Sequence, residues 1–301
     1  MKIKKYFIME RNLLMSFPIV LVKCQQSICL TCCMNLRSNA MLFRSGYHLA
    51  IRFVYLSMVV LSTAADAASL ADTVAMLKPS IVAVGTLQQD RAPPSKFIGT
   101  GFVVGDGNYV ITNAHVMPPP LDTENREVLV VFTGEGAQAR SRTATKIMID
   151  PKHDLALLKI SGPPLPALHF SDAREVREGD SLAFTGFPIG VVLGLYPVTH
   201  RATLSAITPI VIPAAHASQL NVKAIKQLLT PFAVFQLDAT AYPGNSGSPL
   251  YEPETGKVVG IVNMVFVKDT KEHVLSEPSG IAYAVPGEYI VSLIKDAGLA
   301  P

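Results

Sequence analysis

Residues 238–250 read DATAYPGNSGSPL, and the fold prediction for this chain starts from the serine that they contain. Ser246 stands in a short turn between Gly244 and Gly247. Glycine adopts backbone conformations that other residues avoid, so such a turn can expose a hydroxyl and aim neighbouring N–H groups at one point. A nucleophilic serine and its oxyanion hole require this arrangement. The same letters are also typical of an ordinary surface turn, so the turn alone does not separate the two interpretations.

A second segment supplies a residue type that can activate a serine. Residues 111–116, ITNAHV, place His115 directly after an apolar run. An imidazole can accept a proton from a hydroxyl and release it again near neutral pH. A single histidine in such a position is also compatible with a purely structural residue of the core, so His115 becomes informative only together with a partner.

A third segment supplies a carboxylate. Residues 152–159, KHDLALLK, place Asp154 immediately before a strongly apolar run. A carboxylate buried there beside the histidine would fix the imidazole tautomer and stabilise the imidazolium ion. The alternative is a turn aspartate that caps a strand. We expect the neighbouring His153 to point the other way and to face solvent.

The chain after residue 68 is predicted to be all-β. Val, Ile, Phe and Thr gather in short runs bounded by Gly, Pro, Asn and Asp, and regularly spaced short strands favour a barrel or a sandwich. The sequence GDGN at 105–108 predicts a hairpin. Helices are expected at 69–77, 217–229 and 287–298. Strands are expected at 81–87, 98–104, 108–112, 127–132, 143–149, 155–160, 181–186, 197–206, 232–237, 257–266 and 281–285.

TNAHV, HDLALLKI and DATAYPGNSGSPL together resemble the three catalytic segments of chymotrypsin-like serine proteases, specifically those of the HtrA/Deg branch. They occur in the chymotrypsin order of His, Asp and Ser. The resemblance runs from about residue 70 to about residue 295 and includes GTG at 99–101, GFP at 186–188 and GIAYAVP at 280–286.

The resemblance implies a fold of two six-stranded antiparallel β-barrels with short N-terminal and C-terminal helices. It implies a serine endopeptidase without cofactor or metal, acting on exported or unfolded polypeptides. The catalytic triad, in the cleft between the barrels, would be His115, Asp154 and Ser246. The oxyanion hole would be formed at Gly244, Asn245 and Ser246.

The chain departs from the family in four places. A PDZ domain at the C-terminal end is not found in the sequence, and Ser248 replaces the second glycine that usually follows the nucleophile. The segment 187–197 is longer than the corresponding loop of the family. The segment 208–231 contains the predicted extra helix where family members keep a regulatory loop, and this segment could gate the site. An N-terminal Ile-Val-Gly-Gly for activation by propeptide removal is also missing from the sequence.

The resemblance also suggests a substrate pocket. In this fold the base of the primary pocket lies six residues before the nucleophile, at Thr240, and we expect Asn263 and Met264 on the opposite wall. An uncharged base disfavours selection of Lys or Arg. We therefore predict cleavage after small or medium apolar residues.

Residues 1–67 are predicted to be a leader. FVYLSMVVL at 53–61 follows Arg44 and Arg52 and precedes Ala65-Asp66-Ala67, which is the pattern of a secretory signal with its core at about 44–67 and cleavage after Ala67. An uncleaved anchor is the alternative. Because the signal starts far into the chain, we expect translation to begin at Met34 or Met41. The alternative is that 12–22 forms an additional apolar anchor. The remainder, 68–301, would be a periplasmic or secreted protease domain.

Composition agrees with a globular exported domain. The 301 residues are 49% apolar and 16% charged. The leader holds 8 of the 26 basic residues and 2 of the 23 acidic ones, which leaves 18 basic against 21 acidic side chains in 68–301. This balance argues against a nucleic-acid partner. All four cysteines precede residue 34.

Two other functions compete with the protease interpretation. The first is a catalytically inactive, protease-like binding module. The second is a metal hydrolase that uses His115, His153 and His200, although the sequence contains no H-E-x-x-H motif.

Overall fold

The computed structural model describes residues 69–171, 175–188, 194–209, 231–263 and 280–301. The chain divides into two units, Met1–Ala65 and Asp66–Pro301, and every described residue belongs to the second. The predicted leader at 1–67, the predicted helix at 217–229 and Met264 lie outside the described residues. So does most of the segment 208–231.

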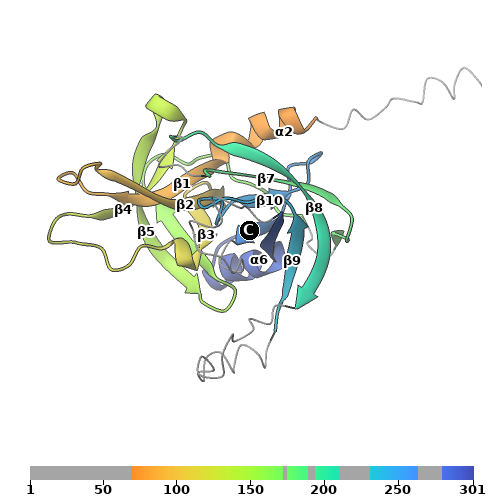
Figure 1. Ribbon diagram of the computed structural model, residues 1–301. Coiled ribbons are helices and arrows are strands. Elements are labelled where there is room, and N and C mark those ends of the chain that lie inside the picture. The colour runs from red at the N-terminus through yellow and green to blue at the C-terminus, as the bar shows by residue number, and fades with distance from the viewer. Residues whose placement is uncertain (1–68, 172–174, 189–193, 210–230, 264–279) are drawn as a thin grey trace, which may run out of the picture. The chain divides into compact units, whose positions relative to one another are not determined.

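The first six strands close into an antiparallel barrel in the order β1-β2-β3-β6-β5-β4 (Figure 1). The hairpin predicted at 105–108 is confirmed, since it joins β2 to β3. The strands of this first barrel are β1 (Ile81–Leu87), β2 (Ser95–Val104), β3 (Tyr109–Asn113), β4 (Val128–Thr133), β5 (Arg140–Asp150) and β6 (Leu155–Ile160).

The last six strands close into a second antiparallel barrel in the order β10-β11-β12-β9-β8-β7. The fold predicted from the sequence, two six-stranded antiparallel barrels, is therefore confirmed. The strands of the second barrel are β7 (Ser181–Gly186), β8 (Val198–Pro209), β9 (Ala233–Asp238), β10 (Pro249–Tyr251), β11 (Val258–Asn263) and β12 (Ile281–Pro286).

Strand β1 illustrates why these apolar runs form barrels. Val82 and Val84 belong to a cluster of buried side chains from the first barrel, whereas Ile81 and Ala83 belong to a cluster shared with the second barrel. Since successive side chains of a strand point to opposite faces, both faces of β1 are covered. This explains why its sequence, IVAVGTL, is continuously apolar rather than alternating.

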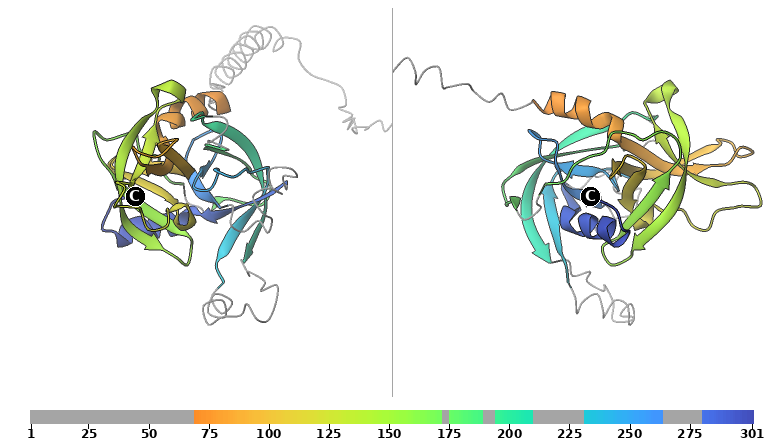
Figure 2. Two further views of the ribbon diagram at one scale, coloured as in Figure 1. Left: turned by 60° about the vertical axis from the view of Figure 1, so that its left-hand side comes forward. Right: turned by 180° about the vertical axis from the view of Figure 1, so that it is seen from behind.

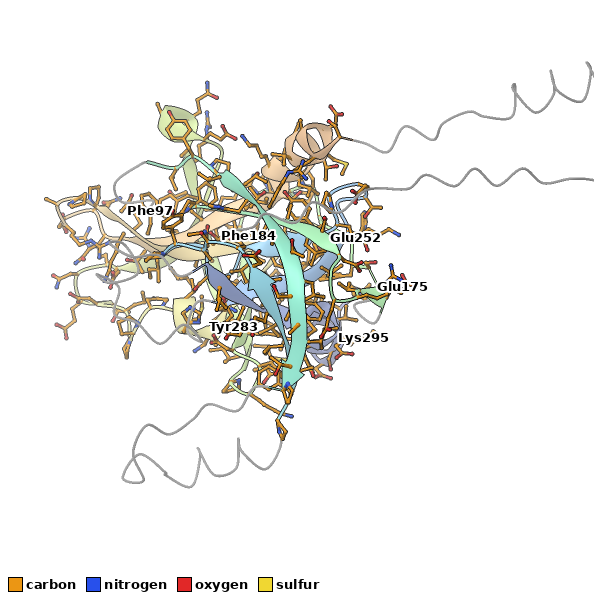
Figure 3. The ribbon with its side chains drawn as sticks, turned by 45° about the vertical axis from the view of Figure 1, so that its right-hand side comes forward. Phe97, Glu175, Phe184, Glu252, Tyr283 and Lys295 are labelled. Carbon is orange, nitrogen blue, oxygen red and sulfur yellow. The ribbon has the colours of Figure 1, made fainter. Side chains whose placement is uncertain are left out.

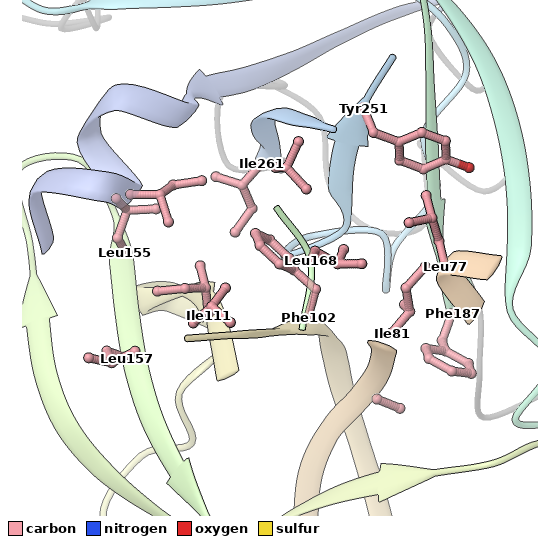
Figure 4. Packing of buried hydrophobic residues seen from close by; sticks show 14 of the residues in the cluster. Leu77, Ile81, Phe102, Ile111, Leu155, Leu157, Leu168, Phe187, Tyr251 and Ile261 are labelled. Carbon is pink, nitrogen blue, oxygen red and sulfur yellow. The ribbon is translucent and has the colours of Figure 1, made fainter. Parts of the chain in front are cut away.

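The shared cluster joins the two barrels. Figure 4 shows Phe102 and Ile111 of the first barrel beside Ile261 of the second, with Leu168 of the connecting segment packed among them. The backbone of that segment bonds to both sides, since Leu168 N–H donates to Val103 and Ser171 N–H donates to Val258. A continuous apolar core therefore fixes the barrels against each other.

Two of the described helices flank the barrels. The N-terminal helix packs on the second barrel, and the C-terminal helix contacts the first barrel as well as the second. Helix α2 (Leu70–Leu77) begins with Ser69, whose hydroxyl caps the N–H of Asp72, and it packs at Gly256 of the second barrel. Helix α6 (Gly287–Asp296) contacts β6 of the first barrel as well as β11 and β12 of the second (Figure 2). No described helix has the length and apolarity needed to cross a bilayer.

Eleven of the twelve strands in the described residues were predicted, three of them with the observed ends and the others with ends that differ by a few residues. Strand β10 was missed because it has three residues and begins at Pro249, a residue that normally argues against a strand. The predicted helix at 69–77 is confirmed as α2, and the one at 287–298 is confirmed but ends at Asp296.

Candidate active site

Ser246 lies in the turn between β9 and β10, and 6% of it is exposed. The two glycines of the turn have positive φ angles, +102° at Gly244 and +89° at Gly247. At Gly247 a side chain is excluded for a second reason, because a Cβ atom there would lie 1.9 Å from the carbonyl oxygen of Thr100. The close approach between turn and strand therefore requires the glycine that follows Ser246.

His115 belongs to a 3₁₀ turn, Ala114–Val116, that directly follows β3. This turn is tied to the end of the neighbouring strand pair, since the Ala114 N–H donates to the Asp154 carbonyl oxygen at 2.9 Å. The imidazole ring therefore starts from a backbone position that is fixed relative to Asp154.

Asp154 occupies the turn between β5 and β6 with φ +55°, a conformation that is uncommon for a residue other than glycine. Its Oδ1 accepts the His115 N–H at 2.9 Å, and its Oδ2 lies 2.5 Å from His115 Nδ1. The side-chain amide of Asn263 donates to the same Oδ2 at 2.7 Å. Three donors thus hold one carboxylate in a single orientation.

The second imidazole nitrogen faces the serine. His115 Nε2 and Ser246 Oγ are 2.8 Å apart, which is a hydrogen-bond distance. The chain thus brings together three side chains that are 39 and 131 residues apart in sequence, measured from His115. The two barrels share them, since His115 and Asp154 come from the first and Ser246 from the second.

The turn also leaves backbone donors available beside Ser246. Across the described residues, the N–H groups of Gly244 and Ser246 donate to no protein acceptor, whereas the Asn245 N–H donates to the Tyr242 carbonyl oxygen at 2.9 Å. Of the three residues expected at the oxyanion hole, Gly244 and Ser246 therefore have free donors. Asn245 is fully buried and contributes to the shape of the turn.

One expectation from the sequence is wrong. His153 does not face solvent, since its side chain is 13% exposed and its Nδ1 lies 2.5 Å from Asp150 Oδ2. The ring stacks on Tyr289 of α6 at a centroid distance of 4.1 Å and meets Phe232 edge-on. The reason is that α6 covers the turn between β5 and β6, so a side chain directed outward from this turn meets the helix.

The pairing with His153 changes the acidity of Asp150. Burial alone would raise the pKa of the Asp150 carboxyl, but hydrogen bonds from the side chain and the backbone of His153 outweigh it and lower the pKa below its usual value. His200, by contrast, stacks on Phe184 in the second barrel, and burial lowers its pKa. The three histidines considered for a metal site thus have different neighbours, and the described residues contain no group of three His, Cys, Asp or Glu side chains able to hold a metal ion.

Thr240, expected at the base of the substrate pocket, is half-buried. Asn263 is fully buried, and its side-chain amide is directed at Asp154. This contact was not foreseen from the sequence, because it depends on how β11 of one barrel meets the turn of the other.

A cavity of about 260 Å³ lies elsewhere, on the second barrel. Figure 3 labels two of its lining residues, Glu175 and Glu252. Asp180 and Glu254 also line it, but neither the serine turn nor His115 does. The cavity therefore belongs to a different part of the surface from the three side chains described above.

Comparison with known sequences points in the same direction as the geometry. The profile of the family described as "Trypsin-like peptidase domain" matches residues 99–261. A protein of Halomonas elongata named "Probable periplasmic serine endoprotease DegP-like" is 27% identical over 198 residues, which are 66% of this chain and 34% of the relative. A protein of Chlamydia pneumoniae with the same name is 32% identical over 218 residues, 70% of this chain and 38% of the relative. The chain therefore matches little more than a third of the length of these relatives.

Solved structures agree on the fold. The active form of the Rv3671c protease from M. tuberculosis superimposes with a TM-score of 0.54 at 23% identity, over 76% of this chain and 85% of that protein. The HtrA-type protease AlgW with a bound tripeptide gives a TM-score of 0.53 at 25% identity, over 76% of this chain and 63% of that protein. Both similarities support the fold of two antiparallel barrels described above.

Proposed function

Because the chain belongs to the trypsin-like peptidase family, we propose that it is a serine endopeptidase with Ser246 as nucleophile, His115 as general base and Asp154 as the carboxylate that orients the base. The observation that carries this proposal is the distance of 2.8 Å between Ser246 Oγ and His115 Nε2, with Asp154 on the opposite side of the ring. A hydroxyl in this position can transfer its proton to the ring as it attacks.

The reaction would proceed in two halves. Ser246 Oγ attacks the carbonyl carbon of the peptide bond while its proton passes to His115 Nε2. The tetrahedral intermediate then collapses, the C–N bond breaks, and the imidazolium gives its proton to the leaving amine. A water molecule repeats the sequence on the acyl-enzyme and releases the new carboxylate together with the free serine.

The negative oxygen of each tetrahedral intermediate would be bound by the N–H groups of Gly244 and Ser246. Their lack of acceptors in the described part of the chain supports this role. Preorganised donors of this kind are worth about 10²–10³ in kcat each, because they need no rearrangement when the charge develops.

The proposed substrates are polypeptides, because both relatives are named serine endoproteases. With Thr240 as an uncharged pocket base and Asn263 and Met264 on the opposite wall, cleavage should follow small or medium apolar residues. A library of peptides, analysed by mass spectrometry after digestion, tests this preference. Cleavage mainly after Arg or Lys would contradict the assignment of Thr240.

The proposed location is the periplasm or the exterior of the cell, with residues 1–67 as a leader that is removed after Ala67 and 68–301 as the protease domain. The relatives named periplasmic support export, and the signal pattern at 44–67 supports its route. Mass spectrometry of the N-terminus of the protein purified from an exporting host tests the cleavage. A mature chain that begins well before Ala68 would contradict it.

Active-site labelling tests the catalytic proposal directly. The 68–301 protein should react with a fluorophosphonate probe, and Ser246→Ala should abolish the reaction while leaving the circular dichroism spectrum unchanged. Ser248→Ala is a matched control, because Ser248 is also buried in the same turn but has no contact with His115, and it should label. A folded wild-type protein that does not label would favour the protease-like binding module.

A further inference from the structure

Thr100 connects the two barrels at the serine turn. It lies in β2 of the first barrel and is fully buried. Its hydroxyl nevertheless bonds to two backbone groups of the second barrel: it donates to the Gly244 carbonyl oxygen at 2.7 Å and accepts the Phe187 N–H at 2.9 Å. A hydroxyl has one proton to donate, and here that proton is directed at the residue that precedes Asn245 in the turn.

The backbone of Thr100 contacts the same turn. Its N–H donates to the Ser246 carbonyl oxygen at 2.8 Å, and its own carbonyl oxygen accepts the Thr112 hydroxyl at 2.7 Å. Thr100 therefore binds the carbonyl oxygens of both Gly244 and Ser246, the two residues whose N–H groups are free. The Gly244 carbonyl lies in one peptide plane with the Asn245 N–H, and the Ser246 carbonyl lies in one plane with the Gly247 N–H. These two planes flank the peptide that carries the Ser246 N–H, and the first is joined to the Gly244 N–H through the α-carbon of Gly244. By fixing both planes, Thr100 limits the rotations that could move the two free N–H groups.

The backbone conformation of Gly244 needs a restraint from outside the turn, more than that of a residue with a Cβ atom would. With φ +102° and no Cβ atom, it has access to a wide range of backbone conformations, and most of them would turn its N–H away from that of Ser246. The side chain of Asn245 makes no hydrogen bond to a described residue, so it does not supply that restraint. The Thr100 hydroxyl is a contact that reaches the Gly244 carbonyl from outside the turn.

We propose that Thr100 is a positioning residue that holds the oxyanion-binding N–H groups of Gly244 and Ser246 in place from the opposite barrel. This inference rests on the proposed serine endopeptidase function. Thr100 does not touch the substrate; it acts through the turn. The turn also lies close to Thr100 at Gly247, where a Cβ atom would be 1.9 Å from the Thr100 carbonyl oxygen. This close packing keeps the turn in contact with Thr100.

Thr100→Val tests the hydroxyl, because valine keeps the shape of threonine and removes the donor. The Gly244 carbonyl and the Phe187 N–H would both lose a buried partner. We expect kcat on a fluorogenic peptide to fall by about 10–100-fold, somewhat less than for deletion of an oxyanion donor itself, with KM changed by less than about threefold. Thr100→Ser keeps the hydroxyl and should restore kcat to within about threefold of wild type.

Thr86→Val is the matched control. Thr86 is also buried, and its hydroxyl also has one acceptor and one donor, Glu127 and Arg91, but it contacts neither the turn nor His115. It should lower the unfolding temperature as Thr100→Val does, yet leave kcat unchanged. The pH dependence of kcat/KM should keep its shape in Thr100→Val, because His115 and Asp154 are not altered.

The outcomes separate this inference from the proposed function. Wild-type protein that neither labels nor turns over would end both proposals. Wild-type activity combined with an unchanged kcat in folded Thr100→Val, or with equal losses in Thr100→Val and Thr86→Val, would overturn the role of Thr100 alone. If Thr100→Val does not fold, Thr100→Ala serves instead, since it also removes the donor to the Gly244 carbonyl oxygen. A wild-type kcat in that variant would likewise overturn the inference.

Discussion

Asp154 combines an uncommon backbone conformation with three bound donors, so its side chain is fixed before any substrate arrives. We expect Asp154→Asn to lower kcat by about 10⁴ while the protein remains folded, because an amide cannot hold the imidazole in the required tautomer. Steady-state kinetics and near-ultraviolet circular dichroism test both parts. A loss of less than about tenfold would argue against the orienting role.

Gly247 offers a test of the packing between the serine turn and β2. Gly247→Ala should destabilise the protein by more than about 3 kcal/mol, because it adds a collision with the Thr100 carbonyl to the strain of a positive φ. Gly298→Ala is the control, since Gly298 also has a positive φ but no atom lies within 4 Å of its added Cβ. It should cost about 1 kcal/mol. Chemical denaturation compares the two, and equal costs would contradict the close approach.

The sequence named the three side chains that the structure brings together, but not all of their contacts. His115, Asp154 and Ser246 could be named because each stands in a short local pattern. The bonds of Thr100 and Asn263 could not be foreseen, since they depend on which strands of different barrels meet. His153 was misjudged for the same reason: its environment is set by α6, more than 130 residues further along the chain.

Among the secondary-structure elements, β1, β4 and the loop at 88–94 are joined by one carboxylate. Glu127 accepts hydrogen bonds from Thr86 and Arg91. The Thr86 hydroxyl makes the largest contribution, followed by Arg91 and the Asp122 N–H, and together they lower the pKa of Glu127 from 4.5 to about 2. A lowered folded-state pKa stabilises the fold above the unfolded value, and that stability is lost as the pH falls toward the folded value.

Glu127→Gln tests this effect of pH. At pH 7 the variant should be less stable than wild type by about 1 kcal/mol, a modest value because the group is partly screened by water. The difference should shrink between pH 4.5 and about 2, the window set by the two pKa values. Unfolding temperatures of the variant and of wild type, measured across this pH range, test the prediction. A difference that grows on acidification would have the wrong sign.

The strands themselves were largely predictable, because buried runs such as IVAVGTL are bounded by turn residues. Strand β1, β6 and β7 have the predicted ends. The end of β8 was placed too early, at 206 instead of Pro209. Its last residues, Ile207 to Pro209, are exposed or partly exposed although they pair with β9, so their sequence lacks the apolar pattern of a buried strand. The exact end of a strand that is set by pairing with its neighbour is therefore hard to predict from amino-acid composition.

At the scale of the whole described molecule, helix α6 helps to hold the two barrels together, because it contacts strands of both. Helix α6 buries Ile290 and Ile294 completely while it contacts strands of both barrels. Ile290→Ala and Ile294→Ala should each destabilise the protein by about 2–5 kcal/mol, because the barrels hold the helix in place and the cavities cannot collapse. Urea denaturation measures the loss, and Val291→Ala on the more exposed side serves as control. Costs below about 1 kcal/mol at the isoleucines would contradict the packing of α6.

All strands of the first barrel precede all strands of the second, and each barrel closes on itself. A break in the chain between β6 and β7 would therefore yield two fragments with complete sheets, one carrying His115 and the other Ser246. With the triad proposed above, neither fragment could hydrolyse a peptide alone. Hydrolysis would return only on reassembly, so enzymatic turnover would act as a readout of association between any two partners fused to the halves.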